Sequence, residues 1–351
     1  MRRILVLGGT GAMGKHLVDI LVQNKENEVV VTTRSQRQDN DNLQYICGNA
    51  HNLDFLSNLL VEGWNYIVDF MSYTTEEFSQ RVDLLLGATS HYFFLSSSRV
   101  YAGADVPLTE ESPRLLDICK NEEYLSTDEY ALAKARQENM LISNAMRNWT
   151  IIRPYITFSE DRLQLGEMEK EEWLFIALKR GVIPFSRDVA DKVTTLTYGK
   201  DVATGIVRLM GQDDSLANIY HLTSGQAIKW SQVLDVYVKT LKEVLGKEIK
   251  VQYTDVSRNF TTIQKWQLQY DRLYDRVFST NKLYLNEGNI PVPEILSNCL
   301  KAFLASNKKF HDYCWSKLGC YDREQGNWEN VFGIPGWKNK ARYIAKRLNL
   351  R

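Results

Sequence analysis

Over the first 160 residues, short apolar runs rich in β-branched and aromatic residues alternate with longer segments whose apolar positions recur every three or four residues. The short runs predict strands and the longer segments predict amphipathic helices. Strands are predicted at residues 4–7, 28–33, 43–47, 65–71, 91–96 and 149–153, and helices at 16–22, 53–61, 76–86 and 128–146. Strands separated by helices imply right-handed crossovers, so the pattern predicts an α/β fold built on a doubly wound parallel sheet.

The pattern loosens after Pro154. Helices are predicted at 173–179, 199–210 and 230–245, short strands at 192–198 and 249–253, and a helical, aromatic segment from residue 289 onward. We therefore expect a doubly wound domain at 1–160, a smaller α/β substrate lobe at 161–288 from which the chain crosses back to the sheet, and a helical C-terminal extension at 289–351.

The chain ends in a basic segment, because six of the last fourteen residues are Lys or Arg. Ile344 and Leu348 fall on one face of the helix predicted there. Such a segment can attach to a membrane surface or to an acidic partner. It can equally be a terminal helix that docks a few apolar side chains and leaves its charges in water, and we favour this second interpretation.

Composition narrows the class of protein. Of the 351 residues 44% are hydrophobic and 25% charged, and the 43 basic side chains balance the 43 acidic ones. A net charge of zero argues against nucleic-acid binding. The five cysteines and five histidines are scattered without metal-ligand spacing, so we expect reduced thiols and no metal. Neither a signal peptide nor a membrane-spanning run is recognised, so we expect a cytoplasmic protein without stable membrane insertion.

A glycine-rich turn stands between the first predicted strand and the first predicted helix. It reads Gly8-Gly9-Thr10-Gly11-Ala12-Met13-Gly14 and satisfies both G-x-G-x-x-G and the wider G-x-x-G-x-x-G spacing. Glycines let the backbone turn sharply and approach a pyrophosphate closely, and the N-terminus of the following helix attracts the anion. In this context the turn predicts a Rossmann-type dinucleotide-binding domain.

The choice of cofactor depends on the end of the second predicted strand, where an NAD-binding domain carries an acidic residue on the ribose. This chain has Thr32-Thr33-Arg34-Ser35 there. Arg34, with Arg37 nearby, can take a 2′-phosphate through charge-assisted hydrogen bonds, which favours NADP(H). If Arg34 instead stacks on adenine, NAD(H) stays possible.

Two further segments indicate hydride chemistry. The fifth predicted strand leads into Ser96-Ser97-Ser98-Arg99-Val100-Tyr101, and a later helix contains Tyr130-Ala131-Leu132-Ala133-Lys134. Oxidation of an alcohol needs a base for the hydroxyl proton, and a phenolate serves only if its pKa of about 10 is lowered. An ammonium group one helical turn away favours the phenolate. The same spacing at Tyr313 and Lys317 lies outside the doubly wound half, and we regard it as chance.

At these residues the chain resembles the extended short-chain dehydrogenase/reductase family, in particular its branch of nucleotide-sugar epimerases, dehydratases and ketoreductases. The resemblance rests on the glycine turn, the serine run, the Tyr130 to Lys134 segment and Ile151-Ile152-Arg153-Pro154, and it extends over about residues 1–285 through 198–203 and 218–222. It implies Ser97, Tyr130 and Lys134 as catalytic residues, with Ser97 orienting a sugar hydroxyl, and a nucleotide-diphosphate sugar as substrate.

The resemblance also implies which residues contact the ligands. The expected cofactor contacts are Gly8, Gly9, Thr10, Gly11, Ala12, Met13, Gly14, Arg34, Asn49, Met71, Tyr130, Lys134 and Pro154, and the candidate substrate contacts are Ser98, Tyr101, Lys192, Arg272 and Arg276. Ser98 is the register alternative to Ser97, and the three basic residues can equally be ordinary surface charges. The family's dehydratases carry Asp and Glu where this chain has Ser98 and Arg99. A 4,6-dehydratase is therefore disfavoured, and 4-epimerisation and 4-keto reduction stay open.

Two expectations concern function and assembly as a whole. A non-catalytic dinucleotide sensor or an RNA-associated protein on the same fold is the alternative to an enzyme, and the presence of Ser97, Tyr130 and Lys134 argues against it. The family's habit implies a homodimer through the helices at 76–88 and 128–148. The apolar faces of these helices could equally lie against the sheet.

Overall fold

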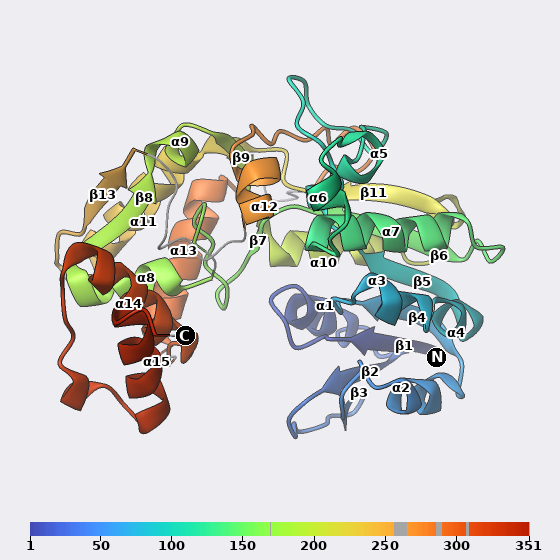
Figure 1. Cartoon of the computed structure of the whole chain (residues 1–351). Helices are drawn as coiled ribbons and strands as arrows, with labels where there is room; N and C mark the ends of the chain where they lie inside the picture. Colours follow the sequence, from blue (N-terminus) through green and yellow to red (C-terminus); the bar gives the residue numbers. More distant parts are fainter. Residues whose placement is uncertain (169, 256–264, 286–289, 307–308, 351) are drawn as a thin grey trace. The chain divides into compact units, whose positions relative to one another are not determined.

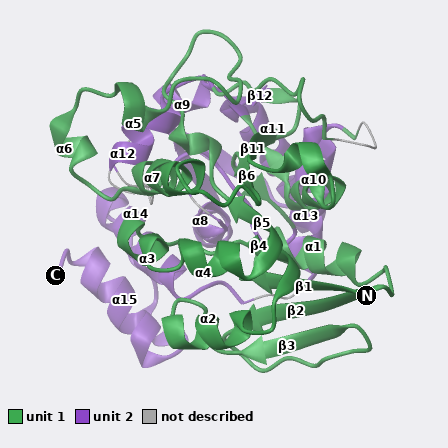
Figure 2. Ribbon diagram, turned by 90° about the vertical axis from the view of Figure 1, so that its right-hand side faces the viewer, with its two compact units in different colours: residues 1–159, 195–227, 276–290 green, residues 160–194, 228–275, 291–351 purple. Residues whose placement is uncertain are grey.

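The computed structural model describes residues 1–168, 170–255, 265–285, 290–306 and 309–350. The chain divides into two compact units (Figure 2). Unit 1 contains Met1–Ser159, Thr195–Ala227 and Arg276–Ile290, and unit 2 contains Glu160–Thr194, Ile228–Asp275 and Pro291–Arg351. The predicted boundary between residues 288 and 289 lies outside the described residues.

Unit 1 is built around a seven-stranded sheet (Figure 1). Its strands are β1 (Arg2–Leu7), β2 (Asn27–Thr33), β3 (Leu43–Cys47), β4 (Trp64–Asp69), β5 (Thr89–Leu95), β6 (Trp149–Pro154) and β11 (Asn218–Leu222). They lie in the order β11-β6-β5-β4-β1-β2-β3, and every neighbouring pair is parallel. The order reverses between β1 and β4, which is where ligands bind in open sheets of this kind. The predicted α/β, doubly wound fold is confirmed.

The helices of unit 1 cover both faces of this sheet. They are α1 (Gly14–Leu21), α2 (Leu53–Leu60), α3 (Thr75–Ser79), α4 (Val82–Gly87), η1 (Ser98–Val100), α5 (Leu115–Ile118), α6 (Glu122–Leu125), α7 (Tyr130–Ile142), α10 (Gly199–Leu209) and η2 (Asp213–Ser215). Alternate side chains of β1 enter two separate cores. Ile4 and Val6 pack with residues of α1 and α10, whereas Leu5 and Leu7 pack with residues of α2, α4 and α7. This alternation is the period of two that a strand buried on both faces requires.

Unit 2 is smaller and mostly helical. Its elements are α8 (Glu172–Arg180), β8 (Val182–Ser186), α9 (Arg187–Ala190), α11 (Trp230–Leu245), β13 (Lys250–Thr254), α12 (Lys265–Gln267), η3 (Leu268–Arg272), α13 (Val292–Ala305), α14 (Tyr313–Gln325), η4 (Val331–Gly333) and α15 (Trp337–Arg347). Strands β8 and β13 pair in parallel. Strands β9 (Val193–Thr195) and β12 (Ala227–Lys229) form another short pair, and β7 (Thr157–Phe158) pairs in parallel with β10 (Thr197–Tyr198) within unit 1.

The predicted helix at 76–86 is wrong in one respect, because the chain forms two helices there, α3 and α4. Between them Arg81 leaves the helical conformation, with φ −128°. Its guanidinium is buried, lies over the ring of Tyr73 and donates to the carbonyl oxygen of His51. The apolar periodicity predicts one continuous helix, and these contacts with neighbouring segments interrupt it. The predicted strand at 192–198 is likewise divided, into β9 and β10.

None of the helices within the described ranges combines the length and the apolar character that crossing a membrane requires.

Candidate functional site

The predicted site residues of unit 1 gather at one edge of the sheet. The glycine turn follows β1, Arg34 follows β2, Met71 follows β4, Ser97 follows β5 and Pro154 ends β6. In a parallel sheet the carboxyl ends of all strands meet at the same edge. Residues predicted one by one from separate motifs therefore share one region of unit 1.

The glycines of the turn have three different structural roles. Gly8 has φ +70°, which a side chain would strain. Around Gly9 and Gly14 there is no space, because a β-carbon at Gly14 would lie 2.6 Å from the Cα of Gly9. Gly11 is open, and a β-carbon there would meet only the carbonyl oxygen of Gly8, at 3.7 Å. The turn thus packs α1 closely on β1 and leaves an accessible backbone at Gly11.

Helix α1 begins directly behind this accessible backbone. No side chain caps its N-terminus and its first turn contains no acidic residue. The N-terminal N–H groups of a helix carry a partial positive charge that favours an anion. The turn and α1 therefore fit the pyrophosphate of a dinucleotide, with Thr10, Ala12 and Met13 supplying the surrounding backbone.

Arg34 and Asn49 are exposed at the ends of β2 and β3. The N–H of Gly48 donates to the carbonyl oxygen of Thr33 at 2.8 Å, which ties the two strand ends together. The side-chain oxygen of Asn49 accepts from the N–H of His51. Arg37, the second candidate for a phosphate, lies over the ring of Tyr45 instead.

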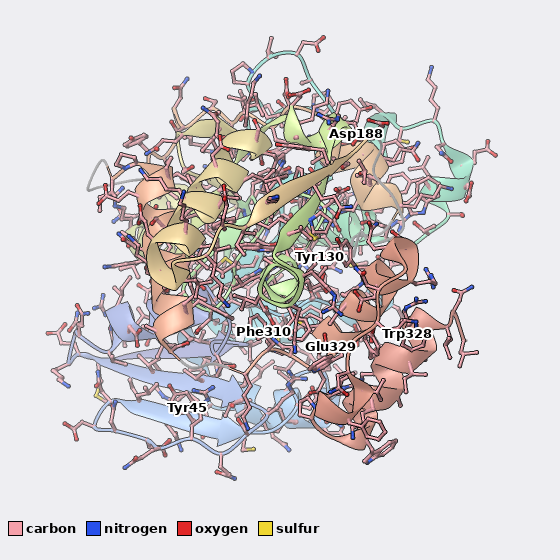
Figure 3. All side chains as sticks on the ribbon, turned by 90° about the vertical axis from the view of Figure 1, so that its left-hand side faces the viewer. Tyr45, Tyr130, Asp188, Phe310, Trp328 and Glu329 are labelled. Carbon is pink, nitrogen blue, oxygen red and sulfur yellow. The ribbon has the colours of Figure 1, made fainter. Side chains whose placement is uncertain are left out.

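Tyr130 and Lys134 lie one turn apart at the start of α7, but their environments differ sharply. Tyr130 is 39% exposed, whereas Lys134 is 2% exposed. The Lys134 ammonium donates to the carbonyl oxygen of Met71 at 3.3 Å and lies 4.5 Å from the centroid of the Phe94 ring. Burial lowers the pKa of Lys134 to about 8, against the opposing effect of Asp69 and Glu138. The site therefore holds a buried amine one helical turn after an accessible phenol; Tyr130 is labelled in Figure 3.

Arg99 contacts the ring of Tyr130 from the end of β5. Its guanidinium carbon lies 5.3 Å from the ring centroid, and its Nη2 atom is 2.6 Å from Glu129. Glu129 caps α7 by accepting from the N–H of Ala131, and it also accepts from the hydroxyl of Tyr124. One carboxylate therefore fixes both the first turn of α7 and the guanidinium beside Tyr130.

The serine run is divided among three environments. Ser96 donates to Glu138 at 2.5 Å, and Ser98 donates to the carbonyl oxygen of Arg153 at 2.8 Å. Ser97 precedes η1, and its hydroxyl accepts from the N–H of Arg99 at 3.2 Å. The hydroxyls of Ser96 and Ser98 thus both form hydrogen bonds within the protein.

A buried polar network holds α7 against the sheet. Glu138, which is fully buried, accepts from Arg153 through two nitrogens at 2.8 and 2.7 Å and from Arg114 at 3.1 Å. Arg153 also donates to the hydroxyl of Tyr101, which in turn contacts His221. Burial lowers the pKa of His221 to about 4, so its imidazole is neutral at pH 7. The hydroxyl of Tyr101, an expected substrate contact, is therefore already bonded within the protein.

The other expected substrate residues do not share one environment. In unit 1, Arg276 is buried and donates to the carbonyl oxygens of Tyr101 and Ala102. In unit 2, Arg272 is buried and donates to the carbonyl oxygen of Gly166 and to Asp271, while Lys192 is half-buried. Only Lys192 among these three has a substantially accessible side chain.

Three residues of this region were not predicted from the sequence. They are Asp69 at the end of β4, Glu129 at the N-terminus of α7 and Glu138 within it. Glu138 lies four residues after Lys134, so helical spacing placed it on the same face, but nothing in the sequence indicated its partners. A carboxylate that ends an apolar strand, as Asp69 does, is the one signal that could have been read.

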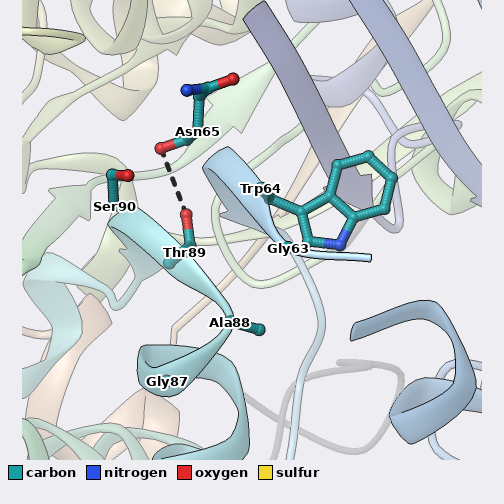
Figure 4. A pocket seen from close by; sticks show the side chains of 7 residues that line it. All are labelled: Gly63, Trp64, Asn65, Gly87, Ala88, Thr89 and Ser90. Carbon is teal, nitrogen blue, oxygen red and sulfur yellow. Dashed lines mark hydrogen bonds between the residues drawn. The ribbon is translucent and has the colours of Figure 1, made fainter. Parts of the chain in front are cut away.

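A surface hollow of about 440 Å³ lies at the opposite edge of the sheet (Figure 4). It is lined by Gly63, Trp64, Asn65, Gly87, Ala88, Thr89 and Ser90, at the amino ends of β4 and β5. The lining contains no ionisable side chain, so this hollow offers none of the acid–base groups found at the carboxyl edge.

The fold and the glycine turn define a dinucleotide-binding protein of the Rossmann class. The model of the NAD dependent epimerase/dehydratase family matches residues 4–222, more than half of the chain, and the chain belongs to this family. The predicted resemblance to the extended short-chain dehydrogenases/reductases is confirmed.

Solved structures similar to this chain have the same fold. A dTDP-glucose 4,6-dehydratase from Bacillus anthracis, in complex with NAD, is 15% identical and aligns with a TM-score of 0.65 over 90% of this chain and 100% of its own. An epimerase from Methanothermobacter thermautotrophicus is 13% identical, with a TM-score of 0.66 over 87% of this chain and 93% of its own. A UDP-glucuronic acid 4-epimerase from Bacillus cereus, also with NAD, is 16% identical, with a TM-score of 0.57 over 72% and 86%.

One curated relative matches in sequence over a short segment. UDP-glucuronic acid decarboxylase 6 from Arabidopsis thaliana is 52% identical over 42 residues, which is 12% of this chain and 12% of that protein.

Proposed function

We propose that this protein is an NAD(P)-dependent oxidoreductase or epimerase that acts on a nucleotide-activated sugar. The observation that carries the proposal is the pair on α7: a buried Lys134 one turn after an accessible Tyr130, at the sheet edge that also bears the glycine turn. Family membership supports a nicotinamide dinucleotide as cofactor. The names of similar structures, which include a dTDP-glucose dehydratase and a UDP-glucuronic acid epimerase, support a nucleotide sugar.

The proposed proton transfer uses residues of unit 1 alone. Tyr130, held as a phenolate by the Lys134 ammonium, takes the proton of the sugar hydroxyl and becomes a neutral phenol. Ser97 holds the same oxygen in position. When bound, the dinucleotide supplies a hydride acceptor or donor at the sugar carbon.

The carbon attacked and the direction of the reaction are the finer part of the proposal. A 4,6-dehydratase is expected to carry Asp and Glu at the positions of Ser98 and Arg99, and neither of these side chains is a carboxylic acid. Ser98 is bonded to the Arg153 carbonyl, and Arg99 is paired with Glu129. We therefore propose 4-epimerisation or 4-keto reduction. Denaturing freshly purified protein and identifying any released nucleotide by mass spectrometry separates the two. Stoichiometric NAD(H) supports an epimerase that retains its cofactor, whereas an empty protein that binds NADPH supports a ketoreductase.

Replacing Tyr130 by Phe tests the catalytic assignment. The variant keeps the ring and loses the hydroxyl, so kcat falls by roughly 10²-fold or more, the usual scale for a positioned general acid or base. Tyr313→Phe is the matched control, because Tyr313 shares the Tyr-x-x-x-Lys spacing and lies in unit 2. A kcat for Tyr130→Phe equal to that of the control contradicts the assignment and favours a non-catalytic dinucleotide-binding protein.

Arg34 tests the proposed preference for NADP(H). We propose that the exposed Arg34 at the end of β2 pairs with a 2′-phosphate, which only NADP(H) carries. We expect Arg34→Ala to raise the Kd for NADPH at least tenfold more than the Kd for NADH, and Arg37→Ala, whose guanidinium lies over Tyr45, to change the two by similar factors. Equal losses of both cofactors in Arg34→Ala contradict the phosphate contact and leave NAD(H) as the cofactor, as in the NAD complexes of similar structures.

A further inference from the structure

Asp69 is a buried carboxylate at the centre of the sheet. It is the last residue of β4, and its strand neighbours are Leu7 of β1 and Phe94 of β5. Its Oδ1 atom accepts from the N–H of Met71 at 2.9 Å, and its Oδ2 atom accepts from the hydroxyl of Tyr92 at 2.8 Å. A buried charge costs free energy unless it is stabilised, so the groups around this carboxylate indicate what it does.

The contacts of Asp69 lead directly to Lys134. Met71, whose N–H binds Asp69, is the residue whose carbonyl oxygen accepts from the Lys134 ammonium at 3.3 Å. Phe94, the strand neighbour of Asp69, supplies the ring that contacts the same ammonium. The carboxylate therefore fixes the short segment that holds Lys134.

Two carboxylates, Asp69 and Glu138, favour the charged form of Lys134, and the effect of Asp69 is the larger. Glu138, on α7 itself, also attracts the ammonium, but Arg153 and Arg114 already form ion pairs with it. The hydrogen bonds to Asp69 come instead from neutral donors, namely the N–H of Met71 and the hydroxyls of Tyr92 and Tyr73. A carboxylate that other cations do not neutralise acts more strongly on a nearby charge in a low-dielectric interior.

The remaining ionisable groups act on this pair more weakly. Tyr130 lies on α7 one turn before Lys134, with Arg99 over its ring. Arg81 lies over the ring of Tyr73 and influences the hydroxyls of Tyr73 and Tyr92. Burial raises the pKa of Asp69, and the Lys134 charge acts against this rise. Asp69 in turn acts against the lowering of the pKa of Lys134, so each of the two groups favours the charged form of the other.

We propose that Asp69 is a positioning residue for Lys134: its carboxylate fixes the Met71 carbonyl that binds the ammonium, and its negative charge keeps this buried amine protonated at neutral pH. The inference rests on the proposed function for its catalytic meaning, because a neutral Lys134 cannot stabilise a phenolate. The electrostatic part concerns only unit 1 and holds whatever the substrate is.

Titrating Lys134 directly tests the proposal without a substrate. Protein labelled with ¹³C at the lysine ε-carbons is titrated by NMR, and Lys134→Arg identifies the Lys134 resonance. We expect a midpoint near 8 in the native protein. In Asp69→Asn, which keeps the shape and loses the charge, we expect the midpoint to fall by about one pH unit or more. Asp83→Asn, which removes a charge from an exposed position on α4, serves as the control and leaves the midpoint unchanged.

A reciprocal measurement covers a failure of Asp69→Asn to fold. The Lys134 charge lowers the pKa of Asp69, so Lys134→Met raises the pKa of the Asp69 carboxyl, which ¹³C NMR of labelled aspartates follows. If the Lys134 midpoint in Asp69→Asn, or the pKa of Asp69 in Lys134→Met where Asp69→Asn does not fold, equals the native value, the proposal is overturned. If the midpoint falls and the native protein oxidises or epimerises no nucleotide sugar, the Asp69 proposal stands and the proposed function fails. If the protein is active, the alkaline limb of its kcat against pH moves with the midpoint.

Discussion

At the scale of single residues, the glycines of the turn differ in how much space each leaves for a side chain. Gly14 has no room for a β-carbon because the backbone of Gly9 lies against it, whereas the space at Gly11 is open. Sequence motifs treat the three glycines alike. The structure gives Gly11 and Gly14 different physical reasons and therefore different expected phenotypes.

Gly11→Ala and Gly14→Ala form a matched pair that tests this difference. In Gly11→Ala we expect Tm within a few degrees of native, because the added methyl group meets only one atom at 3.7 Å, while the Kd for the dinucleotide rises at least tenfold. In Gly14→Ala we expect Tm itself to fall, since the new β-carbon would lie 2.6 Å from the Cα of Gly9. Differential scanning fluorimetry and titration with NADH or NADPH give both quantities. Native affinity in Gly11→Ala contradicts the role given to that backbone.

A second prediction at this scale concerns how the Lys134 contribution to the free energy of unfolding depends on pH. Its pKa is about 8 in the folded protein and 10.5 when unperturbed. Between these values the unfolded chain binds more protons than the folded one, so the Lys134 contribution to the free energy of unfolding rises with pH in this window and is constant below about pH 8. The charged amine is therefore a cost to stability at pH 7.

Lys134→Met isolates that contribution in a Tyr130→Phe background, because Lys134 is proposed to act on the titration of the Tyr130 phenol. We expect the free energy of unfolding of Tyr130→Phe, relative to the double variant with Lys134→Met, to increase by about 1 kcal/mol per pH unit between pH 8 and 10. Urea denaturation at several pH values measures it. A difference that does not change with pH, or that falls as pH rises, contradicts the lowered pKa.

At the scale of elements, α7 carries the proposed catalytic pair, and its position depends on Glu138. This buried carboxylate connects α7 to β6 through Arg153 and to the segment before α5 through Arg114. Arg114 also binds Asp117, whose side chain is 44% exposed. The same arginine thus offers one buried and one surface ion pair for comparison.

We expect Glu138→Gln to lower the free energy of unfolding by about 3–5 kcal/mol, because it leaves the buried guanidinium of Arg153 without its carboxylate. Asp117→Asn, the control, removes the exposed pair of the same Arg114 and costs about 0–1 kcal/mol. Chemical denaturation of both variants measures the difference. Losses of equal size would show that α7 is held by packing alone.

The elements themselves were largely predictable from the sequence. Strands buried on both faces read as short apolar runs, so β2, β3 and β6 lie within a residue or two of their predicted positions. The break between α3 and α4 was not predictable, since it depends on the contact of Arg81 with the distant His51 carbonyl.

The same limit applies to the site. Tyr130 and Lys134 are local in sequence and could be proposed from their spacing. Asp69 and Glu138 derive their roles from contacts between segments far apart in the chain, which single-sequence patterns do not contain.

At the scale of the whole molecule, the C-terminal extension is an integral part of unit 2. Helices α14 and α15 pack closely, and a β-carbon at Gly319 would lie 2.5 Å from the carbonyl oxygen of Tyr343. Their apolar side chains form one core with Phe175 and Ile176 of α8. Arg180 of α8 pairs with Asp322 of α14 and with Glu329, which is labelled beside Trp328 in Figure 3. These contacts within unit 2 favour a docked terminal helix, which is the interpretation preferred from the sequence.

Two aromatic residues of α15 test that interpretation. Tyr343 is fully buried, and its hydroxyl donates to the buried Asp322 at 2.7 Å, whereas Trp337, on the same helix, is 74% exposed. We expect Tyr343→Ala to lower the free energy of unfolding by about 3–5 kcal/mol, because it leaves a cavity and removes a hydrogen bond to a buried carboxylate. Trp337→Ala, a deletion of similar size on the exposed face, changes it by less than about 0.5 kcal/mol. Calorimetry and limited proteolysis of the two variants compare them directly, and a Tyr343→Ala protein as stable as Trp337→Ala would mean that α15 does not belong to the core of unit 2.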